Sequence, residues 1–394
     1  MKKTLLALFT AFLMGCGEKL SLDEFPTNIL TSQVPVFYSP VAPIWSGNTL
    51  SSISGIGGFN RPSDILVGYD ETVYIVDAGN NRVVQTDLAG EVLGTSRFIS
   101  RPKAAVQTRN MRLFVTAVID TTINFGGFLG TRRVPVAAIF RLNLVSASGR
   151  ISNATPELYY LHPVSRASDT LVRFNGITAV YDNTVYVARS GAVNNIGSFE
   201  QPDNAILLFP QNFNPQTDRP ALIPGLTASG TGSGALDAIS SLTSYAQPPQ
   251  SPAVSRDLAF FFTSTSPTQN FKAQRVNYVV SSSGEGFVPD ITFLTTPGKF
   301  RRPTDITFAG DETQFVFVLD SETDSLYQFD VRGVEGVVPR TAPSERYNVS
   351  FSRFGGGTDA LRDPEGVAYY QRTLYIADTG NNRILRFRLT TDIR

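Results

Sequence analysis

The chain is divided into short runs in which apolar side chains alternate with polar ones or follow one another, and turn-forming residues separate these runs. Residues 72–77 (TVYIVD) and 373–378 (TLYIAD) are two examples, and a turn containing glycine and asparagine follows each of them. Short runs rich in β-branched and aromatic residues are typical of β-strands. Few stretches have the apolar spacing of a long amphipathic helix, so the pattern predicts a protein that is almost entirely β-structure.

One combination of strands and turns occurs twice, near the two ends of this β-rich region. The first copy covers residues 61–65 and 72–84, and the second covers residues 363–367 and 373–385. Each copy predicts a strand after a proline, a second strand, a polar turn and a third strand, which together form an antiparallel meander. An internal repeat of this kind indicates a protein built from similar units.

The polar turn contains an aspartate, a glycine, two asparagines and an arginine in both copies. Gly79 and Gly380 can adopt the positive φ that a tight turn demands, the asparagines tolerate the same conformation, and we expect the aspartates to accept hydrogen bonds from turn amides. The turn is therefore assigned a structural role. Its residues are Asp77, Gly79, Asn80, Asn81, Arg82, Asp378, Gly380, Asn381, Asn382 and Arg383.

These turns and their flanking strands resemble the NHL repeat, whose units are the four-stranded blades of a β-propeller. A third unit covers residues 302–306 and 315–330, although Ser-Glu-Thr-Asp stands at residues 321–324 in place of the glycine and asparagines. Weaker units begin near residues 101, 175 and 236. The resemblance implies an all-β, six-bladed β-propeller with four-stranded antiparallel blades, while the sequence leaves counts of five and seven open.

The repeats also predict how the ring closes. The chain ends three strands into its last blade, so we expect a segment between about residues 34 and 56 to supply the fourth strand. A ring closed by an N-terminal strand leaves no open sheet edge. The resemblance further implies that Arg82 and Arg383 pair with a carboxylate or carbonyl of a neighbouring blade.

The N-terminus has the features of a bacterial lipoprotein signal. Two lysines precede an apolar run at residues 4–14, which is too short to span a bilayer. The run ends in Leu-Met-Gly-Cys, which resembles the lipobox, so we expect Cys16 to carry a lipid that anchors the chain in a membrane. In a Gram-negative cell, the glycine after Cys16 favours the outer membrane, because an aspartate there resembles an inner-membrane retention signal. The predicted division is a signal peptide at 1–15, a lipidated N-terminus and tether partly packed on the domain at 16–47, and the propeller at 48–394.

Charge and composition exclude several classes of protein. Lys+Arg and Asp+Glu both total 34 and the basic residues are scattered, so we do not expect nucleic-acid binding. The single cysteine rules out an internal disulfide. His162 is the only histidine, which excludes metal sites built on two or three histidines and leaves a Ser-His-Asp triad dependent on one loop residue. The sequence contains no other evidence of an enzyme.

Three carboxylates mark the clearest candidate site. Asp64, Asp305 and Glu365 each follow a blade-opening proline closely, so each is expected to begin an innermost strand near one mouth of the central channel. Asn175 is a possible fourth member. The set resembles the metal site of the lactonase and senescence-marker propellers, which implies a Ca²⁺ ion or a polarised water. The alternative is that these side chains cap strand starts or bind structural water; no other cofactor is expected.

Two insertions, at residues 120–133 and 190–202, follow the second strands of units two and three. Equivalent loops of a propeller share a face, and loops on a rigid scaffold commonly carry binding residues. Within them, Phe125, Phe128 and Phe199 are either exposed anchors for a partner or part of the packing.

These observations favour a membrane-anchored envelope lipoprotein whose propeller is a non-catalytic binding or assembly module for a protein, peptide or glycan. The alternative is a Ca²⁺-dependent hydrolase or lactonase with its site at the channel mouth. A third interpretation is a purely structural role in an envelope complex. The choice rests on fold analogy at this stage, and fold alone does not define function.

Overall fold

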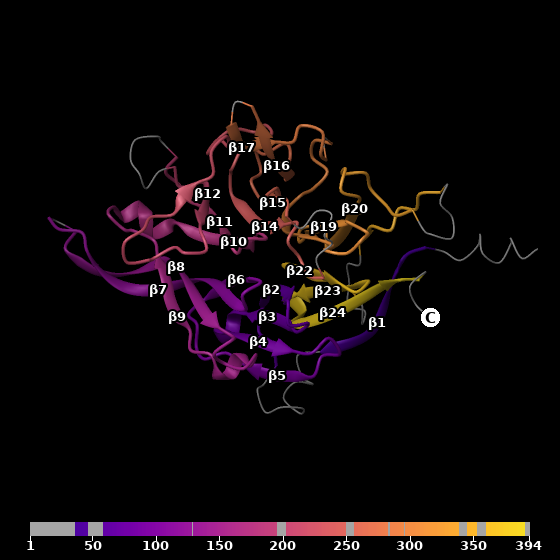
Figure 1. The fold of residues 1–394 in the computed structure, drawn as a ribbon, viewed down its shortest axis with the longest axis horizontal. Coiled ribbons are helices and arrows are strands. Elements are labelled where there is room, and N and C mark those ends of the chain that lie inside the picture. The colour runs from indigo at the N-terminus through magenta and orange to yellow at the C-terminus, as the bar shows by residue number, and fades with distance from the viewer. Residues whose placement is uncertain are drawn as a thin grey trace, which may run out of the picture.

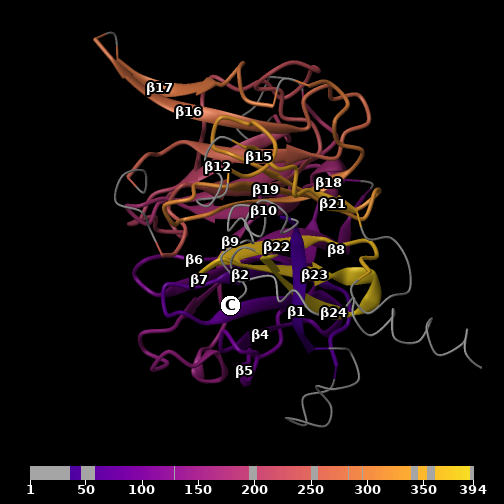
Figure 2. The same cartoon turned by 90° about the vertical axis from the view of Figure 1, so that its right-hand side faces the viewer.

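The chain forms an all-β structure of six four-stranded antiparallel sheets, which confirms the six-bladed β-propeller predicted from the repeats (Figures 1 and 2). Only short 3-10 helices accompany the strands in the part of the chain that the structure describes, and none of its helices is long and apolar enough to cross a membrane. The computed structural model describes residues 36–45, 58–127, 129–194, 202–249, 256–282, 284–294, 296–338, 345–352 and 360–390.

Blades 1 to 3 each contain four consecutive strands, and the first strand of each is the innermost. Blade 1 consists of β2 (Pro62–Val67), β3 (Val73–Asp77), β4 (Arg82–Thr86) and β5 (Val92–Thr95). Blade 2 consists of β6 (Pro102–Gln107), β7 (Arg112–Asn124), β8 (Thr131–Asn143) and β9 (Glu157–Leu161). Blade 3 consists of β10 (Arg173–Ala179), β11 (Val185–Ser190), β12 (Ala205–Phe209) and β13 (Ala221–Leu222).

Blades 4 and 5 follow the same order, whereas blade 6 takes its fourth strand from the N-terminal part of the chain. Blade 4 consists of β14 (Ile239–Ser244), β15 (Phe260–Ser264), β16 (Ala273–Ser281) and β17 (Gly284–Pro289). Blade 5 consists of β18 (Pro303–Phe308), β19 (Val316–Asp320), β20 (Ser325–Phe329) and β21 (Phe351–Ser352). Blade 6 consists of β22 (Gly366–Tyr370), β23 (Thr373–Asp378), β24 (Arg383–Leu389) and β1 (Tyr38–Trp45).

The six innermost strands form a closed ring. Each of them contacts the innermost strand of the next blade, and β22 of blade 6 returns to contact β2 of blade 1. Because every blade packs between two others, the middle strands are buried wherever the neighbouring blades cover them. Strands β3, β19 and β23 are accordingly buried at every residue.

Strand β1 closes the ring as predicted. It pairs antiparallel with β24, with Tyr38 opposite Leu389. The Tyr38 ring is buried and lies 6.2 Å from the ring of Phe317 and 6.1 Å from that of Phe351, both in blade 5. Part of the segment assigned to the tether therefore packs on the propeller, while Cys16 and the signal segment lie outside the described residues.

Of the two residue types in the polar turns that can adopt positive φ, the asparagine does so. Asn81 and Asn382 have φ of 56° and 53°, whereas Gly79 and Gly380 do not adopt positive φ. The glycines are needed for close approach instead, because the Gly79 N–H donates to the Asn60 carbonyl at 2.8 Å and a Cβ on Gly79 would lie 2.6 Å from that oxygen. The residue types therefore predicted the turn, but they did not show which of its residues would have positive φ.

The aspartate of each turn is a buried acceptor. Asp77 accepts hydrogen bonds from the Asn60 N–H at 2.7 Å, from Asn80 Nδ2 at 2.8 Å and from Arg82 Nε at 2.8 Å. Asp378 repeats the arrangement with Arg362, Asn381 and Arg383. The carboxylate that each turn arginine pairs with thus belongs to its own turn, which corrects the expectation of a carboxylate from a neighbouring blade.

The residue with positive φ in each turn links its blade to the next one. Asn81 Oδ1 accepts the Arg101 N–H at 2.8 Å, and Asn382 Oδ1 accepts the Arg61 N–H at 2.7 Å. In blade 5, Asp324 takes the same conformation with φ of 46° and accepts the Asp363 N–H at 2.8 Å. An aspartate oxygen accepts this bond as well as an amide oxygen does, which explains why the divergent turn still works.

Candidate functional site

We call the face of the ring at which the innermost strands begin the entrance face. Successive antiparallel strands alternate in direction, so the turn between the second and third strands of every blade lies on this same face. The bond from Asn81 to the start of blade 2 is one consequence of this arrangement.

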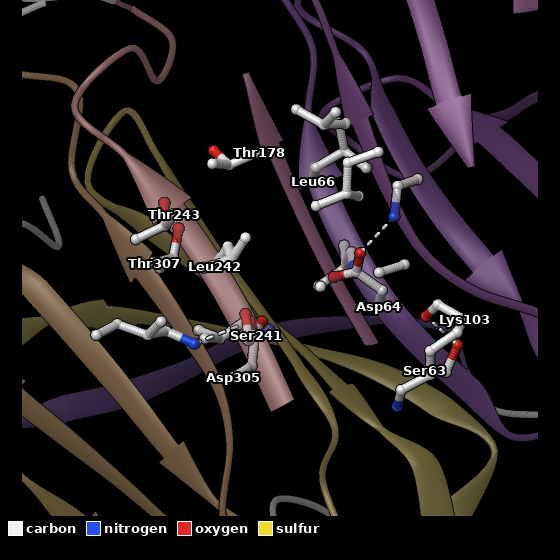
Figure 3. Close-up of a pocket in the computed structure, with 18 of the residues that line it drawn as sticks. Ser63, Asp64, Leu66, Lys103, Thr178, Ser241, Leu242, Thr243, Asp305 and Thr307 are labelled. Carbon is white, nitrogen blue, oxygen red and sulfur yellow. Dashed lines mark hydrogen bonds between the residues drawn. The ribbon is translucent and has the colours of Figure 1, made fainter. Parts of the chain in front are cut away.

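A cavity of about 60 Å³ lies on the axis of the ring and is lined by the innermost strands of all six blades. Since one water needs roughly 10–15 Å³ by this measure, the cavity has room for about four. All four side chains predicted from the sequence, Asp64, Asn175, Asp305 and Glu365, line it. Figure 3 shows Asp64 and Asp305 facing the cavity from different strands.

A β-bulge occurs at the same position in the innermost strands of the first five blades. The bulged position is the one that carries Ser63, Lys103, Asn175, Ser240 and Thr304. A bulge turns its side chain out of the regular ladder, which brings the side chain toward the neighbouring blade.

Most bulged side chains donate a hydrogen bond to the backbone of the next blade. Ser63 Oγ donates to the Lys103 carbonyl at 2.8 Å, and Asn175 Nδ2 donates to the Ile239 carbonyl at 2.9 Å. The hydroxyls of Ser240 and Thr304 bind the carbonyls of Pro303 and Pro364 in the same way. The sequence analysis identified Asn175 but missed the hydroxyls of Ser63, Ser240 and Thr304. Their equivalent positions at the start of each repeat unit could have identified them.

The residue after the bulge is an aspartate in blades 1 and 5. Asp64 accepts the N–H of Ile65 and, through Oδ2, the N–H of Ala105 in blade 2 at 2.8 Å. Asp305 accepts the N–H of Val367 in blade 6 at 2.6 Å and the hydroxyl of Ser241 in blade 4. Both carboxylates therefore hold neighbouring blades together.

Blades 3 and 6 have glycine at this position. A Cβ on Gly176 would lie 2.7 Å from Ser241 Cα, and a Cβ on Gly366 would lie 2.7 Å from Asp64 Cα. At these two junctions the innermost strands approach too closely for any side chain. Neighbouring blades are thus joined by aspartate hydrogen bonds at some junctions. At others, the backbones of their innermost strands pack directly against each other.

Burial raises the pKa of Asp64 well above its ordinary value, and the nearby charge of Asp305 raises it further. Burial also raises the pKa of Asp305, although the bonds from Ser241, Val367 and Ile306 oppose this effect. Because each charge disfavours the other, the two carboxyl groups titrate as a pair.

Glu365 makes a different contact. Its Oε2 forms an ion pair of 2.7 Å with Lys103 Nζ, and both side chains are partly exposed at the cavity mouth. Lys103 belongs to blade 2 and Glu365 precedes β22 of blade 6, so the pair passes over blade 1. No charge pattern in the sequence pointed to this contact.

The interior of the cavity is chemically uneven. Thr178, Thr243 and Thr307, from three successive blades, line the cavity together with the apolar side chains of Leu66 and Leu242 (Figure 3). The buried Thr178 hydroxyl has no partner among the described residues.

A hydrogen bond also crosses the ring. The Tyr69 hydroxyl, from the segment after β2 of blade 1, donates at 2.5 Å to the carbonyl of Ala246 of blade 4, and Ala246 lines the cavity.

The donors at the cavity mouth do not match a Ca²⁺ site as they are arranged. Both oxygens of Asp64 and of Asp305 accept backbone amides, and Glu365 is paired with Lys103. Within the described ranges, no group of three His, Cys, Asp or Glu side chains is placed to hold a metal ion. Ca²⁺ takes about six to eight oxygen ligands, and each aspartate oxygen here already uses a lone pair to accept a backbone amide.

His162 lies away from this cavity, in the packing between blades 2 and 3. Its side chain is buried, and its ring packs edge-on against Phe174 at 6.1 Å. Burial, assisted by the positive charge of Arg189, lowers its pKa to about 4. The histidine is therefore a neutral packing residue at physiological pH.

The insertion at residues 120–133 is not a loop as expected. Strands β7 and β8 continue to pair as far as Asn124 opposite Thr131, and the extended hairpin projects from the body of the propeller (Figure 1). At its base, Asp120 forms an ion pair with Arg101 on the entrance face. Phe125 near the tip is half-buried, while Phe128 and Phe199 lie outside the described residues.

No family model matches this chain, and no curated protein matches it. Solved structures with a similar fold include a protein of unknown function from Bacteroides thetaiotaomicron, with 13% identity, coverage of 90% of this chain and 76% of that chain, and a TM-score of 0.52. The PQQ-bound aldose sugar dehydrogenase of Streptomyces coelicolor is 11% identical, with 90% and 98% coverage and a TM-score of 0.51. A gluconolactonase from Xanthomonas campestris is 11% identical, with 90% and 97% coverage and a TM-score of 0.48. At these identities the likeness to the first two structures shows the overall fold alone.

Proposed function

We propose that this chain is a lipid-anchored lipoprotein of the cell envelope whose propeller acts as a non-catalytic binding or assembly module. The observation that carries the proposal is the use of the cavity-mouth side chains. Asp64, Asn175 and Asp305 make hydrogen bonds between blades, and Glu365 makes an ion pair across the mouth. Because these side chains already bind other residues of the ring, we assign them a structural role. We therefore assign partner binding to the surface of the entrance face.

The course of the chain supports the use of the entrance face for binding. Strand β24 runs from Arg383 at the entrance face to Leu389 at the opposite face, and Tyr38 of β1 pairs with Leu389. The chain therefore joins the propeller at the face opposite the entrance. A lipid on Cys16 would therefore connect to the propeller at that opposite face, away from the entrance face and its long hairpin.

Shortening the long hairpin tests the binding role. Residues 121–134 are replaced by Asn-Gly, which joins Asp120 to Pro135, a pair already opposite each other in the two strands. After mild crosslinking in cells, we expect the shortened chain to lose an envelope partner that the native chain retains. The control shortens the β16–β17 hairpin on the opposite face by replacing residues 280–285 with Asn-Gly. A native chain recovered alone under all conditions, or a partner retained by the shortened chain, would contradict the binding role.

The anchor has a separate test. The native chain is expected to incorporate labelled palmitate and to sediment with membranes, because two or more acyl chains give durable attachment. A Cys16→Ser variant should lose both properties. Equal membrane association of the two proteins would overturn the lipoprotein proposal without affecting the fold.

A Ca²⁺-dependent hydrolase remains the second candidate, and one observation favours it. Two buried carboxyl groups with raised pKa, Asp64 and Asp305, face a polar cavity beside the Ser241 hydroxyl, and such perturbed groups cluster at catalytic sites. Metal analysis of the purified protein separates the two candidates. Tightly bound Ca²⁺ that is lost in an Asp64→Asn, Asp305→Asn double variant would favour the enzyme, whereas metal-free protein would favour the binding module.

A further inference from the structure

A second pocket lies on the entrance face beside the cavity mouth, with a volume of about 380 Å³. It is formed where the segments leading into blades 1, 5 and 6 meet two of the polar turns, and Glu365 lines both this pocket and the central cavity. The lining residues that could contact a ligand are Asn60, Arg61, Arg302, Ser321, Arg362 and Asp363.

Three arginines in this pocket have free guanidinium groups. Arg61, Arg302 and Arg362 are exposed, and their side chains make no hydrogen bond or ion pair with any residue that the structure describes. The turn arginines Arg82 and Arg383, by contrast, are paired with buried aspartates. Three unpaired cations in one concave site create a positive potential that attracts an anion.

The backbone holds each of these arginines in place. The Arg61 N–H donates to Asn382 Oδ1 at 2.7 Å, and the Arg362 N–H donates to Asp378 Oδ1 at 2.7 Å. The Arg302 N–H donates to the Asp320 carboxylate at 3.1 Å. The guanidinium groups therefore extend from fixed points around the pocket, which reduces the entropy that a ligand must overcome.

The rest of the lining is polar rather than apolar. Asp363 and Glu365 are its only acidic side chains, and Glu365 is already neutralised by Lys103. Asp363, Asn60 and Ser321 offer oxygen acceptors and donors of the kind that bind sugar hydroxyls. The volume falls in the range of about 300–1,000 Å³ that is usual for small-molecule sites.

From this combination we propose that the pocket binds an acidic sugar, in which a carboxylate or phosphate meets the arginines and ring hydroxyls meet Asp363, Asn60 and Ser321. Guanidinium groups bind both anions through paired N–H donors, so the two share one recognition chemistry. The inference rests on the proposed binding function and names the ligand class that the entrance face takes.

The test is calorimetric titration of the full-length protein in detergent with four probes: galacturonate, glucose 6-phosphate, glucose and inorganic phosphate. We expect one of the two acidic sugars to bind at least tenfold more tightly than glucose and inorganic phosphate, and the affinity to fall as salt is added. Tighter galacturonate would identify a carboxylated sugar, and tighter glucose 6-phosphate a phosphorylated one.

The matched variants are Arg302→Gln and Arg362→Gln, with Arg332→Gln on the opposite face as the control. We expect each pocket variant to lose at least tenfold in affinity and the control to bind like the native protein, with thermal midpoints unchanged. Affinity that survives both pocket variants, binding of inorganic phosphate as tight as that of the acidic sugars, or no binding of any acid would overturn the inference. Because the hairpin experiment detects an envelope partner independently of sugar, failure here and failure of the binding module are distinguishable.

Discussion

Lys103 and Glu365 join blade 2 to blade 6 across the cavity mouth, with Nζ and Oε2 2.7 Å apart and blade 1 between them. The pair is the one salt bridge at the mouth that links non-adjacent blades among the described residues. Lys103 also accepts the Ser63 hydroxyl through its carbonyl, so the same residue is tied to blade 1 by its backbone and to blade 6 by its side chain.

The exposure of this pair limits its contribution to stability. Lys103 and Glu365 side chains are 37% and 21% exposed, and ion pairs in such settings contribute about 0.2–1 kcal/mol. We expect Lys103→Met and Glu365→Gln each to lower the free energy of unfolding by less than about 1 kcal/mol. Urea unfolding of both single variants and the double variant measures the coupling. A coupling well above this range would show that water is excluded from the mouth.

The turn glycines are expected to be intolerant of a methyl group. In Gly380→Ala the new Cβ would lie 2.7 Å from the Arg362 carbonyl oxygen, so the turn or the segment before blade 6 must move. Overpacking of this kind costs about 1–3 kcal/mol. Gly286→Ala is the control, because its Cβ would meet nothing within 4 Å. Thermal unfolding should distinguish the two; equal midpoints would contradict the close approach.

Ring closure depends on Tyr38. Its ring is buried between blades 5 and 6, and truncating a buried aromatic residue costs about 3–5 kcal/mol. We predict that Tyr38→Ala destabilises the protein by this amount and increases protease cleavage within β1. Phe37→Ala is the matched control, since the neighbouring Phe37 side chain is 44% exposed. Similar losses for both variants would mean that β1 is not the closing strand.

The Asp305 carboxyl gives a pH-dependent prediction. Its pKa rises from 3.8 to about 6 on folding, so its contribution to stability is present below pH 3.8 and is lost as the pH rises through about 6. Relative to Asp305→Asn, the native protein should therefore lose up to about 3 kcal/mol of stability between pH 4 and pH 7. Urea unfolding across this range measures the difference. Parallel profiles for the two proteins would show that Asp305 remains charged.

His162 has the opposite pH dependence. Its pKa falls from 6.5 to about 4 on folding, so the stability that it contributes is present above pH 6.5 and is lost as the pH falls toward 4. Between pH 6.5 and 5, the native protein should lose roughly 2 kcal/mol relative to His162→Phe, which keeps an aromatic ring against Phe174. A histidine proton resonance that titrates near pH 6.5 in the folded protein would contradict the prediction.

The sequence predicted the ring but not the way its blades are tied. Repeated strands and turns predicted six blades and a closing N-terminal strand, because apolar periodicity records which side chains are buried. The residue types did not show which turn residue has positive φ. Asn81 has it, whereas Gly79 is needed because Asn60 lies against it, and only the structure shows that contact.

The sequence predicted where the candidate site lies, but it did not predict which residues its side chains contact. Asp64 and Asp305 do line the axial cavity, yet their partners Ala105 and Val367 are backbone amides from other blades, which no residue pattern reveals. The β7–β8 hairpin was taken for a loop although residues 119–124 alternate in exposure along a strand. The arginine pocket was missed because its three cations come from segments that are distant in the chain.

The pairing of Tyr38 with Leu389 makes ring closure depend on β24. A chain made from its N-terminus carries β1 early, but the strand that β1 must bind is produced only after all the strands of blades 1 to 5. Contacts between such distant positions form slowly, because a long loop must be closed first. A chain cut short before β24 would leave β1 without its partner strand, so only a polypeptide that includes β24 can close the ring, and protease resistance of β1 would report that closure.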